Sequence, residues 1–281
     1  MSSFSPAPDP FGQIEAIIAR DPGHRGIAPL LLPGSVAAAA HSLVDAEHVL
    51  LITGFFIERA GACETDGLGG TAALRHALSA LDVPTIIVSD RFCEPVMRAA
   101  GFDDMVLYPD AFPLVRAPSH GVAIERVGRH QDGTYRSMRG TDITAMTGPV
   151  DELFLDPGDS ITIGIGDGGN EMGMGKVRER VIDSIPRGPQ IATIVPAHHL
   201  LVAGTGDWGA WGLVAGLSLV VGRSLLPSVE QARGWLDRFV AAGAVDPFSL
   251  VAEARVDGLS WEVGAALLRD LHRVVDAELG A

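Results

Sequence analysis

Short apolar runs, each followed by a polar loop, alternate along this chain with stretches of helical pattern. The runs lie at His48–Thr53, Pro84–Asp90, Met105–Tyr108, 160–165 and 191–195. Each is four to seven residues long and bounded by turn-forming residues, which is typical of a buried strand. Helical segments of about ten residues separate most of them, and this alternation indicates βαβ units with parallel strands. The sequence therefore predicts an α/β fold with a mostly parallel sheet flanked by helices.

The predicted helices cover 36–47, about 71–81, 94–100, 171–184 and 209–221, and the part from residue 228 on is mostly helical. The middle of the chain departs from this pattern. Residues 121–129 alternate as an antiparallel strand does, and Asp132-Gly133 is a hairpin signal. We expect a small β-containing insertion around 110–158.

The length and composition suit a single folded domain. The chain has 281 residues, of which 47% are hydrophobic, so a sizeable core is available. Residues 1–10 contain three prolines but neither a basic nor an apolar stretch, so they do not resemble a signal peptide. We expect a flexible lead-in at 1–20 and one α/β domain at 21–281. Cys63 and Cys93 are too few for a disulfide framework, which favours a reducing, cytoplasmic location.

Charge and hydropathy exclude two classes of partner. The formal net charge is −14, and no run of basic residues is present, so nucleic-acid binding is not expected. The longest apolar stretch, Trp208–Val221, is shorter than a membrane span and reads as a buried helix. An anionic substrate would need local cations, either from a metal ion or from the few arginines.

The glycine-rich segment 161–176 combines a strand with a polar loop. Its loop carries Asp167, Asn170, Glu171 and Lys176. Carboxylate and amide oxygens suit Mg²⁺, Mn²⁺ or Ca²⁺ rather than zinc, so Asp167, Asn170 and Glu171 are candidate ligands of a divalent cation. The alternative is that the glycines serve turn geometry alone.

A second polar loop follows the first strand and leads into a helix. It carries Thr53, Gly54, Glu64, Thr65, Asp66 and Gly67. The N–H groups at a helix N-terminus favour an anion, although Thr65 or Asp66 could equally be an ordinary helix cap. The glycines at 67, 69 and 70 do not form the dinucleotide-binding pattern, so no nucleotide cofactor is expected.

Three further loops carry candidate residues. Asp90 ends the second strand and could be a ligand, a base or a helix cap. Arg139 could hold a substrate carboxylate with two parallel hydrogen bonds, or form a surface ion pair. His198 could act as a general acid or base, unless it is a core or surface histidine. Asp207 and Trp208 lie where another loop enters a helix and could line a binding pocket.

These loops occur within segments that resemble a known family. TGFFI (53–57), ETDG (64–67), MRGTDI (138–143), GIGDGGNEMGMG (164–175) and DWGAWGL (207–213) resemble the C-terminal domain of D-glutamate cyclase in order and spacing. The resemblance covers roughly residues 45–275. One departure follows ETDG, where the family usually has a proline and this chain has Leu68-Gly69-Gly70.

The resemblance implies a carbon–oxygen lyase that converts D-glutamate, a small acidic amino acid, to 5-oxo-D-proline and water. In this reading a divalent cation on Asp167 and Glu171, or Arg139, would neutralise the reacting carboxylate. Asp66, Asp90, Glu64 and His198 are the candidates for proton transfer.

Two other functions fit parts of the pattern. A haloacid-dehalogenase-type magnesium phosphatase also has a G-D-G loop after a strand, but its nucleophilic aspartate motif is not found in the expected order. A non-catalytic module that binds an acidic amino acid would show the same convergent loops. The sequence does not fix the number of subunits, and a homo-oligomer is compatible with it.

Overall fold

A parallel sheet of six strands forms the centre of the protein. The computed structural model describes residues 9–109 and 118–280. The strand order is β5-β4-β1-β6-β7-β8, and every neighbouring pair is parallel. The strands are β1 (Val49–Ile52), β4 (Thr85–Ser89), β5 (Val106–Leu107), β6 (His120–Ile124), β7 (Ile161–Gly166) and β8 (His199–Val202). The predicted α/β class and parallel sheet are confirmed.

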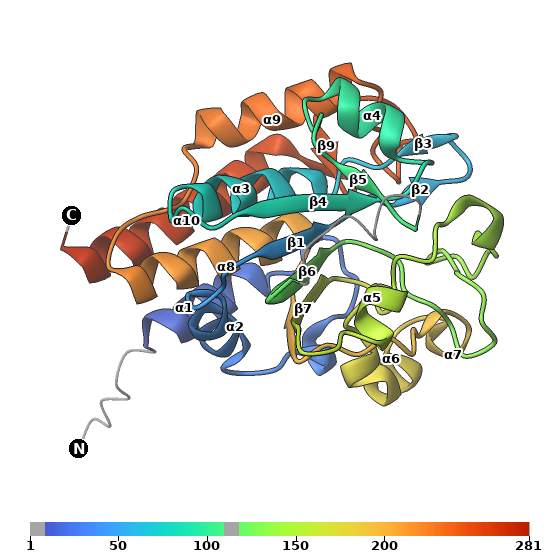
Figure 1. The fold of residues 1–281 in the computed structure, drawn as a ribbon, viewed down its shortest axis with the longest axis horizontal. Helices are drawn as coiled ribbons and strands as arrows, with labels where there is room; N and C mark the ends of the chain where they lie inside the picture. The colour runs from blue at the N-terminus through green and yellow to red at the C-terminus, as the bar shows by residue number, and fades with distance from the viewer. Residues whose placement is uncertain (1–8, 110–117, 281) are drawn as a thin grey trace.

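Helices cover both faces of this sheet (Figure 1). The α-helices are α1 (Pro10–Ile18), α2 (Ser35–Leu43), α3 (Leu68–Ser79), α4 (Glu94–Ala99), α5 (Glu152–Leu155), α6 (Arg178–Ser184), α7 (Gly188–Ile191), α8 (Gly206–Val221), α9 (Val229–Ala241) and α10 (Trp261–Leu279). The short 3₁₀ helices among the described residues are η1 (Ala28–Leu30), η3 (Thr144–Met146) and η4 (Gly175–Val177). Alternate residues of each strand face opposite layers: Val49 and Leu51 pack in the same core as α3 and α8, whereas Leu50 and Ile52 pack with Phe154 of α5.

Two antiparallel hairpins accompany the main sheet. One pairs β2 (Phe56–Ile57) with β3 (Ala62–Cys63), and the other pairs β9 (Arg255–Val256) with β10 (Leu259–Ser260). The first hairpin directly precedes the ETDG loop, and the second directly precedes α10. Both therefore add loops beside the main sheet.

The strand order reverses between β1 and β6. The chain runs outward from β1 through β4 to β5, and then returns to place β6 on the other side of β1. In open α/β sheets the loops diverge at such a switch point, and ligands bind in the resulting crevice outside the carboxyl ends of the strands. The loops after β1 and β6 meet closely here, because a Cβ atom at Gly67 would lie 2.7 Å from Cβ of Glu125.

Two aspartates join the N-termini of α3 and α8. Asp66, just before α3, accepts hydrogen bonds from the N–H groups of Gly206 (2.7 Å) and Asp207 (2.8 Å) in the first turn of α8. Asp207 in turn accepts a hydrogen bond of 2.6 Å from Gly70 N–H in α3. Each helix thus caps the other, which satisfies N–H groups that a helix leaves free at its start. Asp66 also accepts the N–H of Gly67, the N-cap residue of α3, at 2.9 Å, so it bonds to the start of both helices.

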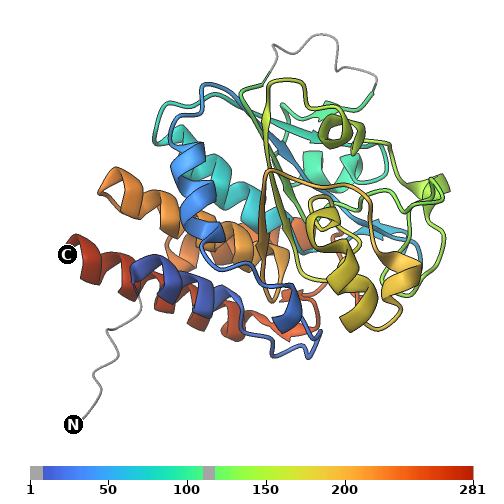
Figure 2. The ribbon, with the colours of Figure 1, turned by 90° about the horizontal axis from the view of Figure 1, so that it is seen from below.

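The predicted flexible lead-in extends too far. Residues 10–18 form α1, which packs against α8 and α10, and Figure 2 shows it lying along α10. The helix begins because Asp9 caps it and Pro10 stands in its first turn, and it buries Ile14, Ile17 and Ile18. Residues 1–8 lie outside the described part of the chain.

Two strands differ from the prediction. The segment expected to begin an antiparallel strand at 121 forms β6, a central parallel strand, and the antiparallel pairing in this region is limited to bridges such as Arg129↔Tyr135. Residues 191–195 are not a strand of the main sheet. Thr193 instead pairs with His130 and donates its N–H to the Gly169 carbonyl, so that this segment supports the glycine-rich loop.

The predicted helix 171–184 also begins later, at Arg178. Glu171 pairs with Val127, and Met172 N–H donates to the Arg126 carbonyl at 2.7 Å, which holds this part of the chain extended. By contrast, the apolar stretch Trp208–Val221, predicted as a buried helix, lies in α8, which is buried along most of its length. Within the described ranges, no helix is both long and apolar enough to cross a membrane.

We predict that Gly70→Ala destabilises the protein. A Cβ atom there would lie 2.7 Å from Cβ of Ala210 in α8 and 3.1 Å from Cα of Asp207, so the helices would have to separate. The free energy of unfolding should fall by about 1–3 kcal/mol, as is usual for overpacking, in urea denaturation. Gly234→Ala in α9 is the matched control, because nothing lies within 4 Å of its Cβ position. That variant should gain about 0.5–1 kcal/mol from helix propensity. Equal stability of the two variants would contradict the close helix contact.

Candidate active site

Seven carboxylates gather near the carboxyl edge of the sheet. They are Glu64, Asp66, Glu125, Asp167, Glu171, Asp207 and Asp257, and each is less than a tenth exposed. Glu125 directly follows β6 and Asp167 directly follows β7, while Asp257 lies in the turn between β9 and β10. We call these seven residues the acidic cluster.

Three members of the acidic cluster could hold a metal ion. One carboxylate oxygen each of Asp66, Glu125 and Asp167 lies within 4.8 Å of the other two. Oε2 of Glu125 and Oδ2 of Asp167 are buried without a hydrogen-bond partner in the described part of the chain. Buried polar atoms are normally satisfied, so these oxygens are free to accept a cation or a proton.

The predicted ligand set overlaps this group only at Asp167. Asn170 and Glu171 follow it in the same loop and are also buried, and Oδ1 of Asn170 and Oε1 of Glu171 likewise have no described partner. The other oxygen of Glu171 accepts the Gly169 N–H at 2.7 Å, and Nδ2 of Asn170 donates to the Arg136 carbonyl at 2.8 Å. These bonds fix both side chains beside the three-carboxylate group.

Burial makes the ionised form of these acids unfavourable. Desolvation and neighbouring carboxylates raise the pKa of Glu64, Asp66 and Glu125 well above the ordinary range. Burial raises the pKa of Asp207 to about 7. These shifts favour proton binding by the cluster, a property that acid–base catalysis uses.

Arg25 is the cation that forms ion pairs with the acidic cluster. Its Nη1 lies 2.9 Å from Oδ1 of Asp167 and its Nη2 lies 2.7 Å from Oδ1 of Asp257. Although burial disfavours its charge, Asp167 and Asp257 raise the pKa of Arg25 well above its ordinary value. In residues 9–109 and 118–280, no other lysine or arginine forms an ion pair with the acidic cluster.

A cavity of about 220 Å³ opens onto these groups. Carboxylates of the cluster and two arginines contribute its polar wall, namely Glu64, Glu125, Asp257, Arg25 and Arg139. Phe55, Ile57, Met138, Pro247 and Phe248 contribute its apolar wall. The size suits a small metabolite, and the mixed lining suits one with several charged groups on a short carbon chain.

Two of the cavity carboxylates have unusual backbone conformations. Glu125 has φ +46° and Asp257 has φ +54°, both in the left-handed region. Aspartate adopts this region more readily than most residues, whereas glutamate is strained there, and such strain is found at functional sites. The conformation turns the chain sharply after β6, so that Glu125 faces the cavity while the next residue, Arg126, reaches the loop after β4.

Several predicted substrate-binding residues hold the loops together instead of lining the cavity. Thr53 donates to the Ile124 carbonyl, Thr65 donates to the Arg255 carbonyl, and the Gly54 carbonyl accepts from Arg126. Gly67 has φ +78° and leaves the space that the neighbouring loop occupies. Glu64 and Arg139 are the predicted residues that do line the cavity.

Both carboxylate oxygens of Asp90 accept hydrogen bonds that join neighbouring loops. It accepts hydrogen bonds from Arg126 Nη2 at 2.6 Å and from the N–H groups of Gly148 and Phe92 at 2.8 and 2.9 Å. Although burial pushes its pKa upward, Arg126 and these N–H groups lower it overall. Such a carboxylate stays ionised and has no free oxygen for catalysis, so we leave it out of the mechanism.

The structure places His198 at the opposite edge of the sheet. It precedes β8, and its Nδ1 accepts the N–H of Thr162 at 3.0 Å near the start of β7. The four residues of β8 separate it by about 13 Å from the carboxyl ends of the strands. The sequence placed His198 after a strand because it predicted a strand at 191–195. In the structure, the strand β8 comes after His198 rather than before it.

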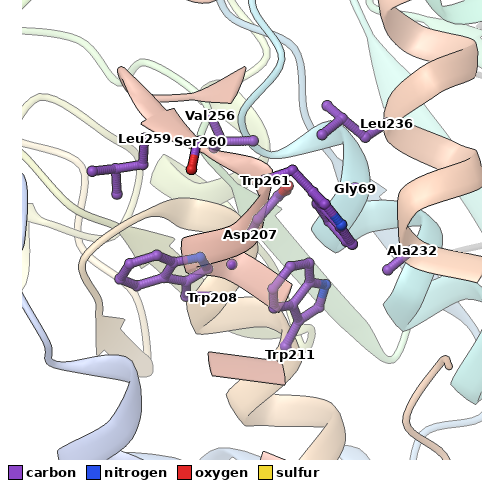
Figure 3. A pocket seen from close by; sticks show the side chains of 11 residues that line it. Gly69, Asp207, Trp208, Trp211, Ala232, Leu236, Val256, Leu259, Ser260 and Trp261 are labelled. Atoms are coloured by element: carbon purple, nitrogen blue, oxygen red, sulfur yellow. The ribbon is translucent and has the colours of Figure 1, made fainter. Parts of the chain in front are cut away.

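Asp207 and Trp208 face a different and smaller cavity. Figure 3 shows Trp208, Trp211 and Trp261 around it, and its volume is about 20 Å³, enough for a single water molecule. Asp207 borders this space while capping α3. Their positions do not favour the predicted role in substrate binding.

Sequence reasoning missed Glu125, Arg25 and Asp257. Glu125 directly follows a buried apolar run, and a parallel assignment of that run would have placed it at the carboxyl edge of the sheet. Arg25 lies more than a hundred residues from its partner Asp167, and no local pattern marks it. Asp257-Gly258 reads only as a hairpin turn.

Comparisons with known proteins place the chain in a family. The human protein D-glutamate cyclase, mitochondrial, is 35% identical over 238 residues, which are 74% of this chain and 38% of that protein. The chain thus spans less than half the length of this relative. A solved structure of an exopolyphosphatase-related protein from Bacteroides fragilis has 8% identity and a TM-score of 0.48, over 88% of this chain and 60% of that one. The family described as D-glutamate cyclase-like, C-terminal, matches residues 14–272. The chain therefore belongs to the D-glutamate cyclase-like C-terminal family.

Proposed function

We propose that the cavity binds D-glutamate and closes it to 5-oxo-D-proline with release of water. The observation that carries the proposal is the buried group of Asp66, Glu125 and Asp167 at the switch point of the sheet, beneath a small cavity with two arginines. The names of the family and of its human relative support this choice of substrate and reaction. The cavity supplies charged groups of both signs for a substrate with two carboxylates and one amine.

Ring closure needs the substrate bent, with its amine near its own γ-carboxylate. Arg139 lines the cavity, and its side chain forms no ion pair in the described part of the chain, so it is available to hold the α-carboxylate. The apolar wall around Phe55 and Ile57 would pack against the methylene groups. Holding the bent conformer supplies much of the rate advantage of an intramolecular reaction.

Proton transfer falls to the cavity carboxyl groups. An ionised carboxylate accepts a proton from the amine, and a protonated one gives a proton to the departing oxygen. We assign these steps to Glu64 and Glu125, because both line the cavity and burial raises the pKa of each. Oε2 of Glu125 has no described partner, which leaves it free to accept the amine proton.

A divalent cation fits the donor set of the cluster. Three carboxylates offer converging oxygens, and Glu125 and Asp167 each have one oxygen without a described partner. Hard oxygen ligands select Mg²⁺, Mn²⁺ or Ca²⁺. Asp66, Glu125 and Asp167 would hold it, with Asn170 and Glu171 alongside. When bound, such an ion supplies positive charge that offsets the carboxylates and polarises a substrate oxygen.

The first test replaces Glu125 by glutamine. Glu125→Gln should lower kcat for 5-oxoproline formation from D-glutamate by about 10²–10⁴-fold, because an amide cannot transfer the proton. The product is followed by chiral chromatography. Glu278→Gln on the exposed end of α10 is the matched control and should retain full activity. Near-normal turnover by Glu125→Gln would exclude the proposed role, and binding of D-glutamate without turnover by the unmodified protein would favour a binding module.

Arg139→Gln tests substrate binding. Loss of a charge-assisted hydrogen bond of about 1.5–3 kcal/mol should raise KM for D-glutamate by about 10- to 100-fold, with a smaller change in kcat. Steady-state kinetics separates the two parameters. Arg269→Gln on the exposed face of α10 serves as the control. An unchanged KM in Arg139→Gln would place the substrate carboxylates elsewhere.

The raised pKa values predict how stability depends on pH. An acid whose pKa is higher in the folded than in the unfolded protein binds more protons when folded, so stability falls as the pH rises between the two values. For Asp207 the unfolded value is about 3.9, and the folded value is about 7. The lowered pKa of Asp90 acts in the opposite sense, but only below about pH 4.

In metal-free buffer the free energy of unfolding should therefore be larger at pH 5 than at pH 8, as measured by urea denaturation. Asp207→Asn should show a shallower decline, since it removes one titrating group. Added Mg²⁺ or Mn²⁺ should recover stability at pH 8 more than at pH 5, because it binds the ionised cluster. Stability that rises with pH, unaffected by either ion, would contradict this account of the buried acids.

A further inference from the structure

A turn closed by the Asp21 carboxylate positions Arg25 in the site. The Asp21 carboxylate accepts the N–H of Arg25 at 2.8 Å and the N–H of Gly26 at 2.7 Å, which fixes the backbone of the loop between α1 and η1. The loop is anchored in turn by α1, which packs against α8 and α10. The guanidinium therefore enters the cavity from a rigid segment that is far from the other site residues in sequence.

The Arg25 guanidinium has N–H groups that its described contacts do not use. It carries five N–H groups, and its described contacts are one to Asp167 and one to Asp257. The ring of Phe248 lies 5.7 Å from it and also lines the cavity. The Arg25 side chain is 14% exposed, so part of it remains open to a molecule in the cavity. These features place a desolvated cation where a substrate would meet the acidic cluster.

The proposed reaction needs such a cation. A γ-carboxylate is a poor electrophile, because its negative charge repels the attacking amine, and the surrounding carboxylates add to that repulsion. Hydrogen-bond donors already oriented in a water-poor site stabilise a developing oxyanion more strongly than water does. Arg139 lies on the exposed side of the cavity, whereas Arg25 directly contacts Asp167 in the cluster.

We propose that Arg25 is a catalytic residue that binds the γ-carboxylate of the substrate and stabilises the oxyanion formed there. The inference rests on the proposed function. The amine nitrogen forms a bond to the γ-carbon, and the electron pair of the C=O bond moves to the oxygen beside Arg25. The substrate ammonium group loses two protons to cavity carboxylates, one before the attack and one from the newly bonded nitrogen. Both protons pass to the second oxygen. The electron pair on the first oxygen then re-forms the C=O bond, and the C–O bond to the second oxygen breaks to release water.

The rival explanation is that Arg25 only neutralises Asp167 and Asp257. A structural role of this kind would affect every substrate equally. A direct role would affect most the substrate whose reacting group carries a charge. D-Glutamate and its γ-methyl ester share the amine and the carbon chain, but the reacting group of the ester is neutral, is a better electrophile and releases methanol instead of water.

The test compares Arg25→Gln and Arg25→Lys on both substrates, after subtraction of the uncatalysed cyclisation of the ester. Arg25→Gln should lower kcat for D-glutamate by about 10²–10³-fold, as loss of one oxyanion donor does. Its loss with the ester should be at least tenfold smaller. Arg25→Lys should recover part of the activity with D-glutamate, because it keeps the charge. Thermal unfolding of each variant checks that the fold persists.

An equal loss with both substrates would overturn the inference and assign Arg25 the structural role, as would unchanged kcat in Arg25→Gln. Neither result would affect the proposed function, provided that the unmodified protein forms 5-oxoproline from D-glutamate. Absence of turnover in the unmodified protein would instead overturn both.

Discussion

The burial of many like charges in one place is the constraint on which the site depends. Seven carboxylates lie around the carboxyl edge of the sheet, each less than a tenth exposed, and Arg25 is the cation that contacts them in the described structure. Ionised carboxylates this close are unfavourable unless protons, cations or hydrogen-bond donors compensate them. The protein uses helix N–H groups for Asp66 and Asp207, and Arg25 for Asp167 and Asp257. Within the described residues, one oxygen each of Glu125, Asp167, Glu171 and Asp257 remains without a hydrogen-bond partner. The proposed chemistry uses oxygens of this group.

The same carboxylates also hold the scaffold together. Asp66 and Asp207 each cap the helix that carries the other, so the position of α3 relative to α8 is tied to the chemistry of the cluster. Close helix contact at Gly70 makes this exchange of hydrogen bonds geometrically feasible. On the other side of β1, Arg126 and Asp90 form a buried ion pair that joins the loops after β1, β4 and β6. Two sets of polar contacts therefore support the site. The helix caps by Asp66 and Asp207 involve members of the acidic cluster, whereas the Arg126–Asp90 ion pair does not.

The sequence predicted an element correctly where its local residue pattern matches its place in the fold. Buried apolar runs such as Val49–Ile52 and Thr85–Ser89 could be recognised as strands, and Asp167 could be placed because it directly follows one. Prediction failed where tertiary contacts override a local pattern. Residues 191–195 are rich in β-branched side chains, yet Ile191 ends α7 and Thr193 pairs with His130 outside the main sheet, and this misplaced His198 by the length of a strand. Arg25 could not be found, because its function depends on contacts with Asp167 and Asp257, which no local spacing encodes.

The most direct test of the central claim is incubation of the purified protein with D-glutamate or L-glutamate, in the presence of Mg²⁺ or Mn²⁺ or a chelator, with 5-oxoproline separated by chirality. The account predicts 5-oxo-D-proline from D-glutamate, at a rate that falls when the chelator removes the ion from the carboxylate cluster. Absence of 5-oxoproline from D-glutamate under every metal condition would contradict it.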